Sequence, residues 1–223
     1  MENKTSNLPK NEMEQSSQLS SIIKNGILFK NPVLYSALGL CPVVAAGLTL
    51  HDGLALSLLL ACLLIPTCLI ASIFGTRIPA AARPPVYLLL SAACYFPAST
   101  IVESVFPKTL LNVGVFAPLM VINAIILRRA DTFAAKHIVF AAVIDSIACS
   151  IGFGLVMCIS SGLREILTLG TLSGYHIFFR RLAVPSVVLP CIGFVLLGFF
   201  AAFVQALRNR RDRVQRRKEK ERS

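Results

Sequence analysis

Charged residues are scarce in this sequence, and the common signatures of nucleotide-binding enzymes are absent. Asp, Glu, Lys and Arg make up 15% of the 223 residues, whereas 55% are hydrophobic, and the mean hydropathy is +0.71. A soluble domain of this size carries more charge and fewer apolar residues. The sequence has no P-loop, no Rossmann glycine pattern and no S-x-A-T-like flavin attachment sequence. We therefore expect a membrane domain without nucleotide chemistry of its own.

Metal-binding and export signatures are also missing. None of the seven cysteines forms a C-x-x-C pair, and most lie in apolar runs, which argues against a zinc site and a disulfide framework. The three histidines are expected on different sides of the membrane, so no three-histidine metal site is predicted. Residues 1–21 are polar and lack an apolar stretch. They predict a disordered cytoplasmic tail rather than a signal peptide.

Long apolar runs dominate the rest of the chain. A helix needs about 20 apolar residues to cross the hydrocarbon core. Six stretches qualify, separated by segments rich in turn residues or charge, from the short HDG at 51–53 to the longest, Ser161–Ala183. The predicted spans are Val33–Leu50, Leu54–Phe74, Val86–Val102, Leu110–Leu127, Ile138–Ser160 and Val184–Ala206. The sequence thus predicts an all-α integral membrane protein with six transmembrane helices.

These spans divide the chain into three parts. Residues 1–30 form a cytoplasmic tail that ends in Ser20–Lys30, either a short interfacial helix or an unstructured lead-in. Residues 31–207 form the six-helix membrane domain. Residues 208–223 form a basic cytoplasmic tail, a topogenic anchor or alternatively a contact for anionic lipid or a partner.

Basic residues predict the orientation in the membrane. With the N-terminus inside, 18 of the 22 Lys and Arg residues fall in cytoplasmic segments, and nine of those 18 lie in the C-terminal tail. The remaining four fall outside, and the bias persists without the tail. Because cytoplasmic loops carry excess Lys and Arg, both termini are predicted to be cytoplasmic, in a multi-pass protein of the inner (cytoplasmic) membrane.

A short motif recurs in the first and fourth predicted spans. Leu38–Pro42 (LGLCP) lies in the first, and Val113–Pro118 (VGVFAP) opens the fourth, with their glycines 75 residues apart. Three spans separate the copies, and three is odd, so the second copy must be inverted. Inverted repeats with Gly/Pro interruptions typically build a midplane site from broken helices.

Cys41 is the thiol best placed for chemistry. It precedes Pro42, and proline favours the first turn of a new helix. A break there would leave the Cys41 sulfur facing free N–H groups, which stabilise a thiolate suited to an iron–sulfur cluster. The alternative is a small apolar core residue, the role we assign to the other six cysteines.

Several motifs together resemble a known family. LGLCP, residues 112–137 (NVGVFAPLMVINAIILRRADTFAAKH) and residues 162–174 (GLREILTLGTLSG) look like the E subunit of the Rnf electron-transport complex. They resemble nearly as well the D subunit of the sodium-translocating NADH:quinone reductase. NPVLYSALGLCP at 31–42 and AAVIDSIACSIGFG at 141–154 fit the first and fifth spans of the family. The resemblance covers most of the chain after Ile27.

The resemblance implies an architecture, a partner and a cofactor. It implies two inverted three-helix repeats, with interrupted first and fourth spans, and a homologous A-type Rnf subunit (or E-type Nqr subunit) of opposite topology. A [2Fe-2S] cluster would lie between the two subunits, with two cysteines from each. Cys41 matches one ligand. The second follows Asn123, where this sequence has Ala124. Alanine cannot bind iron, so another thiol substitutes, the cluster is altered, or this is a degenerate or engineered copy.

Other polar residues lie within the apolar runs. Asp145 is interpreted as a structural partner of a base such as Arg128 or Lys136, or else as part of an ion path. Asn123 is interpreted as a helix–helix hydrogen bond, or else as an ion ligand. The Arg164-Glu165 pair is interpreted as an anchor at the outer membrane edge.

The sequence therefore predicts a membrane subunit of an Rnf/Nqr-type ion-translocating oxidoreductase. It would relay electrons through the membrane, coupled to Na⁺ or H⁺ transport, while soluble partners handle ferredoxin, NADH and flavins. Two alternatives remain open. A small secondary transporter would take up substrate alone and hold no iron. A structural subunit of the same complex would assemble normally without a cluster.

Overall fold

The computed structural model describes residues 39–45, 49–75, 77–136, 138–169, 171–172 and 175–176, together with short helical pieces between 193 and 206. Within this part the architecture is helical, apart from two antiparallel strands of two residues each, β1 (Thr171–Leu172) and β2 (Tyr175–His176). The N-terminal tail, the basic C-terminal tail and much of the predicted first and sixth spans lie outside the described residues.

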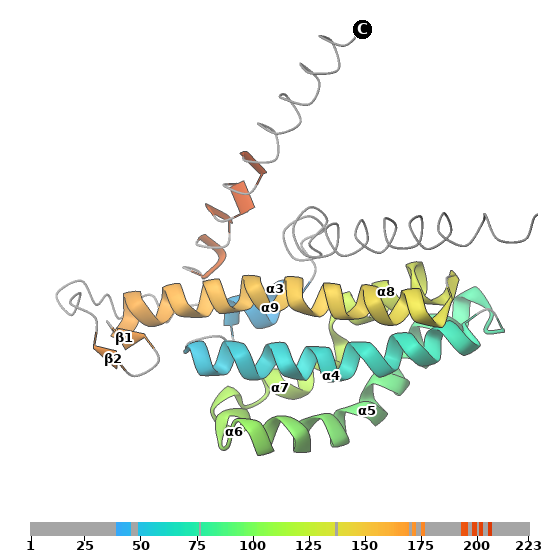
Figure 1. Ribbon diagram of the computed structural model, residues 1–223, viewed down its shortest axis with the longest axis horizontal. Helices are drawn as coiled ribbons and strands as arrows, with labels where there is room; N and C mark the ends of the chain where they lie inside the picture. Colours follow the sequence, from blue (N-terminus) through green and yellow to red (C-terminus); the bar gives the residue numbers. More distant parts are fainter. Residues whose placement is uncertain are drawn as a thin grey trace, which may run out of the picture.

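Three long helices form the body of the described structure. They are α4 (Leu50–Phe74), α5 (Arg83–Val105) and α9 (Val139–Leu169). All three are long and apolar enough to cross a membrane. They confirm the second, third and fifth predicted spans. Figure 1 shows α4 between α9 and α5, with α4 and α9 running in opposite directions.

Small residues allow α4 and α9 to approach closely. A methyl group at Gly53 would collide with the Ser161 side chain, and one at Gly154 would lie 3.4 Å from Cβ of Ser57. The hydroxyls of these serines donate to their own helices, Ser57 to the Gly53 carbonyl at 2.6 Å and Ser161 to the Met157 carbonyl at 2.7 Å. Small residues at the contact are typical of helix pairs in membranes. There, close packing of the two backbones, rather than the hydrophobic effect, drives helix association.

The start of α4 corrects one predicted boundary. His51, Asp52 and Gly53 are expected from the sequence to separate two spans, but they form the first turn of α4. Thr49 is the N-cap: its side chain accepts from the Asp52 amide at 3.2 Å, and the Asp52 carboxylate accepts from the Thr49 amide at 3.2 Å. This reciprocal capping box satisfies two free amides, so the polar residues begin a helix rather than a loop.

The end of α9 corrects another boundary. The sequence predicts a connection over Ser161–Ala183, yet α9 continues as one helix to Leu169. Ser161, Arg164 and Glu165 lie three and four residues apart along this stretch, and all three are buried. A buried face at helical spacing keeps the chain helical beyond the apolar run that defines the span.

The predicted fourth span is a series of short helices. It contains α6 (Thr109–Val113), α7 (Phe116–Leu119), the 3₁₀ turn η3 (Met120–Ile122) and α8 (Ala124–Thr132). Gly114 interrupts the first two with φ = 58°. Asn123 interrupts the last two with an extended backbone, ψ = 125°. Two short 3₁₀ turns, η2 (Ala80–Ala82) and η4 (Ala134–Lys136), lie in the connections before α5 and α9.

The first predicted span has a similar local pattern where it is described. Gly39 has φ = 70° and immediately precedes the short helix α3 (Leu40–Ala45). Thr49, with an extended backbone, then caps α4. Both segments therefore run from a positive-φ glycine through a short helix to an extended N-cap residue. Positive φ is a conformation that glycine adopts without the steric cost of a Cβ atom.

Candidate functional site

The two interrupted segments meet at one place, which we call the half-helix junction: Gly39 and Cys41 on one side, and Asn123, Ala124 and Ile125 on the other. A Cβ atom at Gly39 would lie 2.7 Å from Cδ1 of Ile125 and 3.1 Å from Oδ1 of Asn123. These distances are shorter than van der Waals contact, so any larger residue would have to displace the Ile125 side chain. The structure thus brings the LGLCP motif against the Asn123 motif, 84 residues later in the chain.

The backbone at the junction is set by two helix starts. Cys41 is the second residue of α3, directly after the break at Gly39. Asn123 is the N-cap of α8, and its buried side-chain oxygen accepts from the Ile125 amide at 3.0 Å. Its side-chain nitrogen lies 3.8 Å from the sulfur of Met120. Within the part of the chain that the structure describes, both contacts stay in one segment, and Asn123 acts as a helix cap rather than as a bridge between two helices.

Ala124, the residue at the second ligand position of the family motif, lies on the outer surface of the junction. It is the first residue of α8 and is exposed, and Leu119 and Ile122 beside it expose about half of their surface. Apolar side chains that remain exposed in a membrane protein contact lipid or another subunit.

The groups at the junction do not fit a two-thiolate share of a [2Fe-2S] cluster. Of the two positions that the family motif uses, residue 41 is a cysteine, whereas residue 124 is an alanine, whose methyl group has no donor atom. No group of three or more His, Cys, Asp or Glu side chains suited to a metal ion occurs among the residues that the structure describes. The other described cysteines lie along α4, α5 and α9 as free thiols: Cys62, Cys68, Cys94, Cys149 and Cys158.

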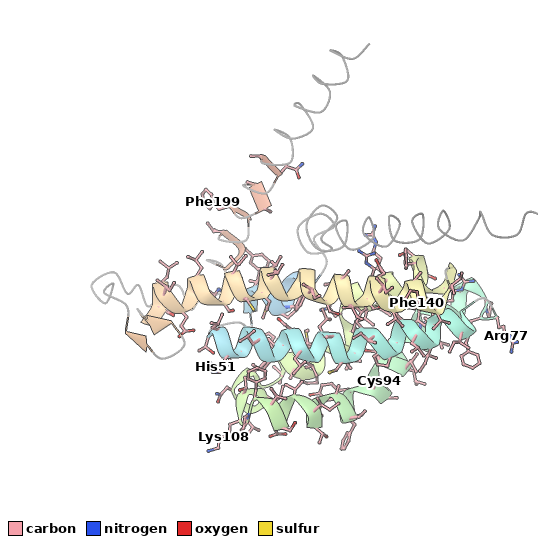
Figure 2. The ribbon with its side chains drawn as sticks, in the orientation of Figure 1. His51, Arg77, Cys94, Lys108, Phe140 and Phe199 are labelled. Carbon is pink, nitrogen blue, oxygen red and sulfur yellow. The ribbon has the colours of Figure 1, made fainter. Side chains whose placement is uncertain are left out.

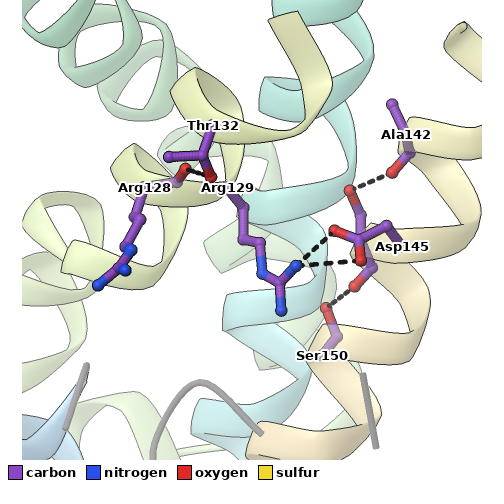
Figure 3. A network of polar contacts seen from close by, with 7 residues as sticks. Arg128, Arg129, Thr132, Ala142, Asp145 and Ser150 are labelled. Atoms are coloured by element: carbon purple, nitrogen blue, oxygen red, sulfur yellow. Dashed lines mark hydrogen bonds and ion pairs between the residues drawn. The ribbon is translucent and has the colours of Figure 1, made fainter. Parts of the chain in front are cut away.

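A second polar centre lies between α8 and α9. Asp145 is only 5% exposed, and both of its carboxylate oxygens lie 3.1 Å from Nη1 of Arg129. Figure 3 shows the Arg129 side chain directed at Asp145, whereas that of Arg128 points away. The predicted structural pairing of Asp145 with a base is therefore correct in kind, and the partner that the structure shows is Arg129, a residue that the sequence interpretation did not name. A buried carboxylate needs such a partner because desolvation is costly.

The Arg164-Glu165 pair is buried, which contradicts its interpretation as an exposed anchor. Oε2 of Glu165 accepts from the Leu50 amide at 2.8 Å, so α9 helps to cap the start of α4. The guanidinium of Arg164 is fully buried and makes no hydrogen bond with a described residue. It occupies the space beside Gly193, where any side chain would collide with it.

The helical periodicity of α8 could have identified Arg129 as the partner of Asp145. No sequence pattern points to the contact between Gly193 and Arg164. Arg129 lies four residues after the buried Ile125, and Arg128 lies four after the exposed Ala124. Residues four apart share a helix face, so a correct start for α8 selects Arg129 as the inward residue. The close approach of Arg164 to Gly193 is a contact across the fold, which no local pattern in the sequence encodes.

Comparison with known proteins assigns a family to this architecture. The chain is 29% identical over 203 residues to the E component of the proton-translocating ferredoxin:NAD(+) oxidoreductase complex of Clostridium ljungdahlii, covering 90% of this chain and 94% of that protein. It is 30% identical over 221 residues to the E component of the ion-translocating oxidoreductase complex of Haemophilus influenzae, covering 92% of each. The protein with the same name from Aliivibrio fischeri is 34% identical over 151 residues, covering 68% of this chain and 66% of that protein. The family model described as "Rnf-Nqr subunit, membrane protein" matches residues 19–201. The chain therefore belongs to the Rnf-Nqr family of membrane subunits.

Proposed function

We propose that this chain is the E-type membrane subunit of an ion-translocating oxidoreductase complex in the inner membrane, and that it takes part in electron transfer through the membrane. The observation that carries the proposal is the half-helix junction, where the two motifs that resemble the family come into contact. The relatives are named as E components of ion-translocating complexes, one of them a ferredoxin:NAD(+) oxidoreductase. A chain without nucleotide-binding motifs would leave the soluble redox chemistry to other subunits.

The proposal includes six spans arranged as two inverted repeats. Its support is the shared pattern at Gly39 and Gly114, each with positive φ and each followed by a short helix and an extended N-cap. The antiparallel contact of α4 with α9 also fits, because these helices would be the second spans of the two repeats.

The proposed partner is a homologous subunit of opposite topology that docks at the half-helix junction. Ala124 and the exposed apolar side chains of Leu119 and Ile122 support this position. A partner there would cover apolar surface and place its own residues next to α3 and α8. A secondary transporter, the alternative from sequence, has less support, because the relatives are named as parts of oxidoreductase complexes.

The cofactor is a separate part of the proposal. A [2Fe-2S] cluster normally takes four thiolates, and only one of the two motif positions in this sequence, Cys41, is a cysteine. We therefore assign no electron-transfer step to a cluster here. The second candidate function is a structural subunit of the same complex that holds no cluster, and Ala124 is the observation that favours it.

Iron content separates these two functions. If Cys41 retains its ligand role, Ala124→Cys is expected to raise iron per purified complex and to strengthen a [2Fe-2S] EPR signal. Adding Cys41→Ala to that variant should remove the gain, because one of the two thiolates is again missing. Iron is measured by elemental analysis of the intact complex, alongside EPR.

The controls are Cys62→Ala and Cys191→Ala, in spans away from the family motif, which should leave the iron content unchanged. If Ala124→Cys leaves the iron content of the complex unchanged, and Cys41→Ala has no effect on it either, then Cys41 is only a packing residue. The electron-relay role would then be withdrawn in favour of the structural subunit.

The ion path is a separate proposal. Asp145 and Asn123 are its predicted positions because polar groups buried in membranes often mark such paths. Both are buried, but Asp145 forms an ion pair with Arg129 and Asn123 caps α8. The ion pair favours the structural role for Asp145, and ion uptake by variants that keep their stability would test the other role.

Orientation is tested by reporter fusions. Fusions after Arg83, Lys136 and Arg213 should report the cytoplasm, and fusions after Lys108 and Arg181 should report the outside. The physical reason is the excess of Lys and Arg in the predicted cytoplasmic segments. Alkaline phosphatase and fluorescent-protein fusions give opposite readouts, and a reversed pattern would refute the predicted orientation.

A further inference from the structure

An apolar cavity of about 350 Å³ lies between the end of α4 and the start of α5. It belongs to neither polar centre described above. Its walls are almost entirely apolar, formed by side chains that include Ile70, Ala71, Phe74, Val86, Leu89 and Ala93. Among the described lining residues only Tyr87 and Arg77 have polar side chains, and the accessible wall is almost wholly apolar. The cavity therefore offers little to orient a sugar, a nucleotide or a quinone carbonyl, but it suits a hydrocarbon chain.

The cavity opens on a face that is apolar outside as well as inside. Leu89 on its rim is 74% exposed, and Phe96 further along α5 is 81% exposed. Phe74 and Val86 are also exposed. A hydrocarbon chain can therefore pass from the bilayer into the cavity without crossing a polar barrier.

One cation is available at the end of the cavity. Arg77 contributes to the cavity wall and is exposed, and it forms no ion pair with a described residue. Figure 2 shows it at the end of the bundle, pointing away from the helices. The neighbouring Arg83 is already engaged: Nε donates to the Ile78 carbonyl at 3.1 Å, and Nη1 lies 3.6 Å from Oδ1 of Asp131. A long Arg side chain lines apolar surface with its stem and presents its charge at the membrane boundary.

We propose that this cavity binds one acyl chain of an anionic phospholipid, whose phosphate pairs with Arg77. The two parts of the ligand match the two parts of the site, a hydrocarbon chain for the apolar walls and a phosphate for the guanidinium. A helix of another subunit would fill the cavity with apolar side chains but leave Arg77 without an anion. The proposal is independent of the function proposed above.

Photo-crosslinking tests the site in the intact complex. The purified complex is placed in phosphatidylcholine vesicles that contain a minor fraction of phosphatidylglycerol or phosphatidylcholine with a diazirine in the acyl chain. Mass spectrometry then locates the crosslinks. We expect crosslinks within residues 70–93, with about fivefold preference for phosphatidylglycerol, the value for one Arg near a membrane surface.

Two variants and a control distinguish the outcomes. Arg77→Gln should remove the headgroup preference, and Ala93→Phe should abolish the crosslinks by filling the cavity. Lys108→Gln, a cation at the other end of α5, should change neither. The proposal would be overturned if both lipids labelled the native complex equally and Arg77→Gln did not change that labelling. The crosslinked lipid would then be ordinary boundary lipid. Absence of lipid crosslinks in this segment of the native complex, with another subunit covering it, would overturn it as well.

Discussion

Replacing Arg129 with methionine is expected to destabilise the complex by about 3–5 kcal/mol, the cost of leaving one charge of a buried pair without its partner. Methionine keeps much of the aliphatic volume and removes the guanidinium, so Asp145, which is 5% exposed, stays buried without Arg129. The expected readout is a large drop in the apparent melting temperature of the purified complex, or failure to assemble.

The adjacent residue provides a matched control. Arg128 is exposed and points away from Asp145 (Figure 3), so Arg128→Met should change stability by no more than about 0.5 kcal/mol. The double variant Arg129→Met with Asp145→Asn removes both charges and should recover most of the loss, because a buried pair is often replaceable by neutral side chains. Equal effects of the two single Arg variants would show that the ion pair is not what stabilises α8 against α9.

The Gly39→Ala variant is expected to disrupt the half-helix junction. A Cβ atom destabilises the left-handed conformation by about 1–2 kcal/mol, and Gly39 has φ = 70°. The added methyl would also press against Ile125 at 2.7 Å and Asn123 at 3.1 Å, and such overpacking costs about 1–3 kcal/mol. The two effects together are expected to lower the melting temperature and the yield of assembled complex.

Gly114→Ala separates steric collision from backbone strain. Gly114 also has positive φ, but a methyl there would come no closer than 4.0 Å, to the carbonyl oxygen of Leu111. It should therefore incur the strain alone and lose less stability than Gly39→Ala. Ile125→Val removes the Cδ1 atom that the methyl would strike, so combining it with Gly39→Ala should restore part of the loss. If Gly39→Ala and Gly114→Ala lowered the stability equally, the contact between the two motifs would contribute nothing measurable to the stability.

Apolar run length is enough to predict the long helices, but not where they begin and end. The runs at Leu54–Phe74, Val86–Val102 and Ile138–Ser160 correspond to α4, α5 and α9, because a helix that crosses the bilayer needs a minimum apolar length. Hydropathy assigns Thr49 and Asp52 to a span end and a turn, although their spacing is that of a capping box. Hydropathy also misses the polar end of α9, because the stability of that end comes from contacts with α4.

The sequence predicts the two motifs of the site, but it does not predict that they come into contact. Gly39 and Asn123 each stand out, by glycine–proline context and by a polar residue in an apolar run, yet their contact joins positions far apart in the chain. The choice between Arg128 and Arg129 requires the helical phase of α8, which depends on the break at Asn123. The close approach of Arg164 to Gly193 also joins positions far apart in the chain. Each of these facts depends on tertiary structure.

The most direct test of the proposed function is ion uptake by inverted membrane vesicles from cells in which this chain is deleted or restored, driven by electron transfer between ferredoxin and NAD(+). The account predicts that deletion abolishes both the electron transfer and the coupled ion uptake, and that the intact chain restores both together. Undiminished ferredoxin:NAD(+) activity and ion uptake without the chain would contradict its role as a subunit of such a complex.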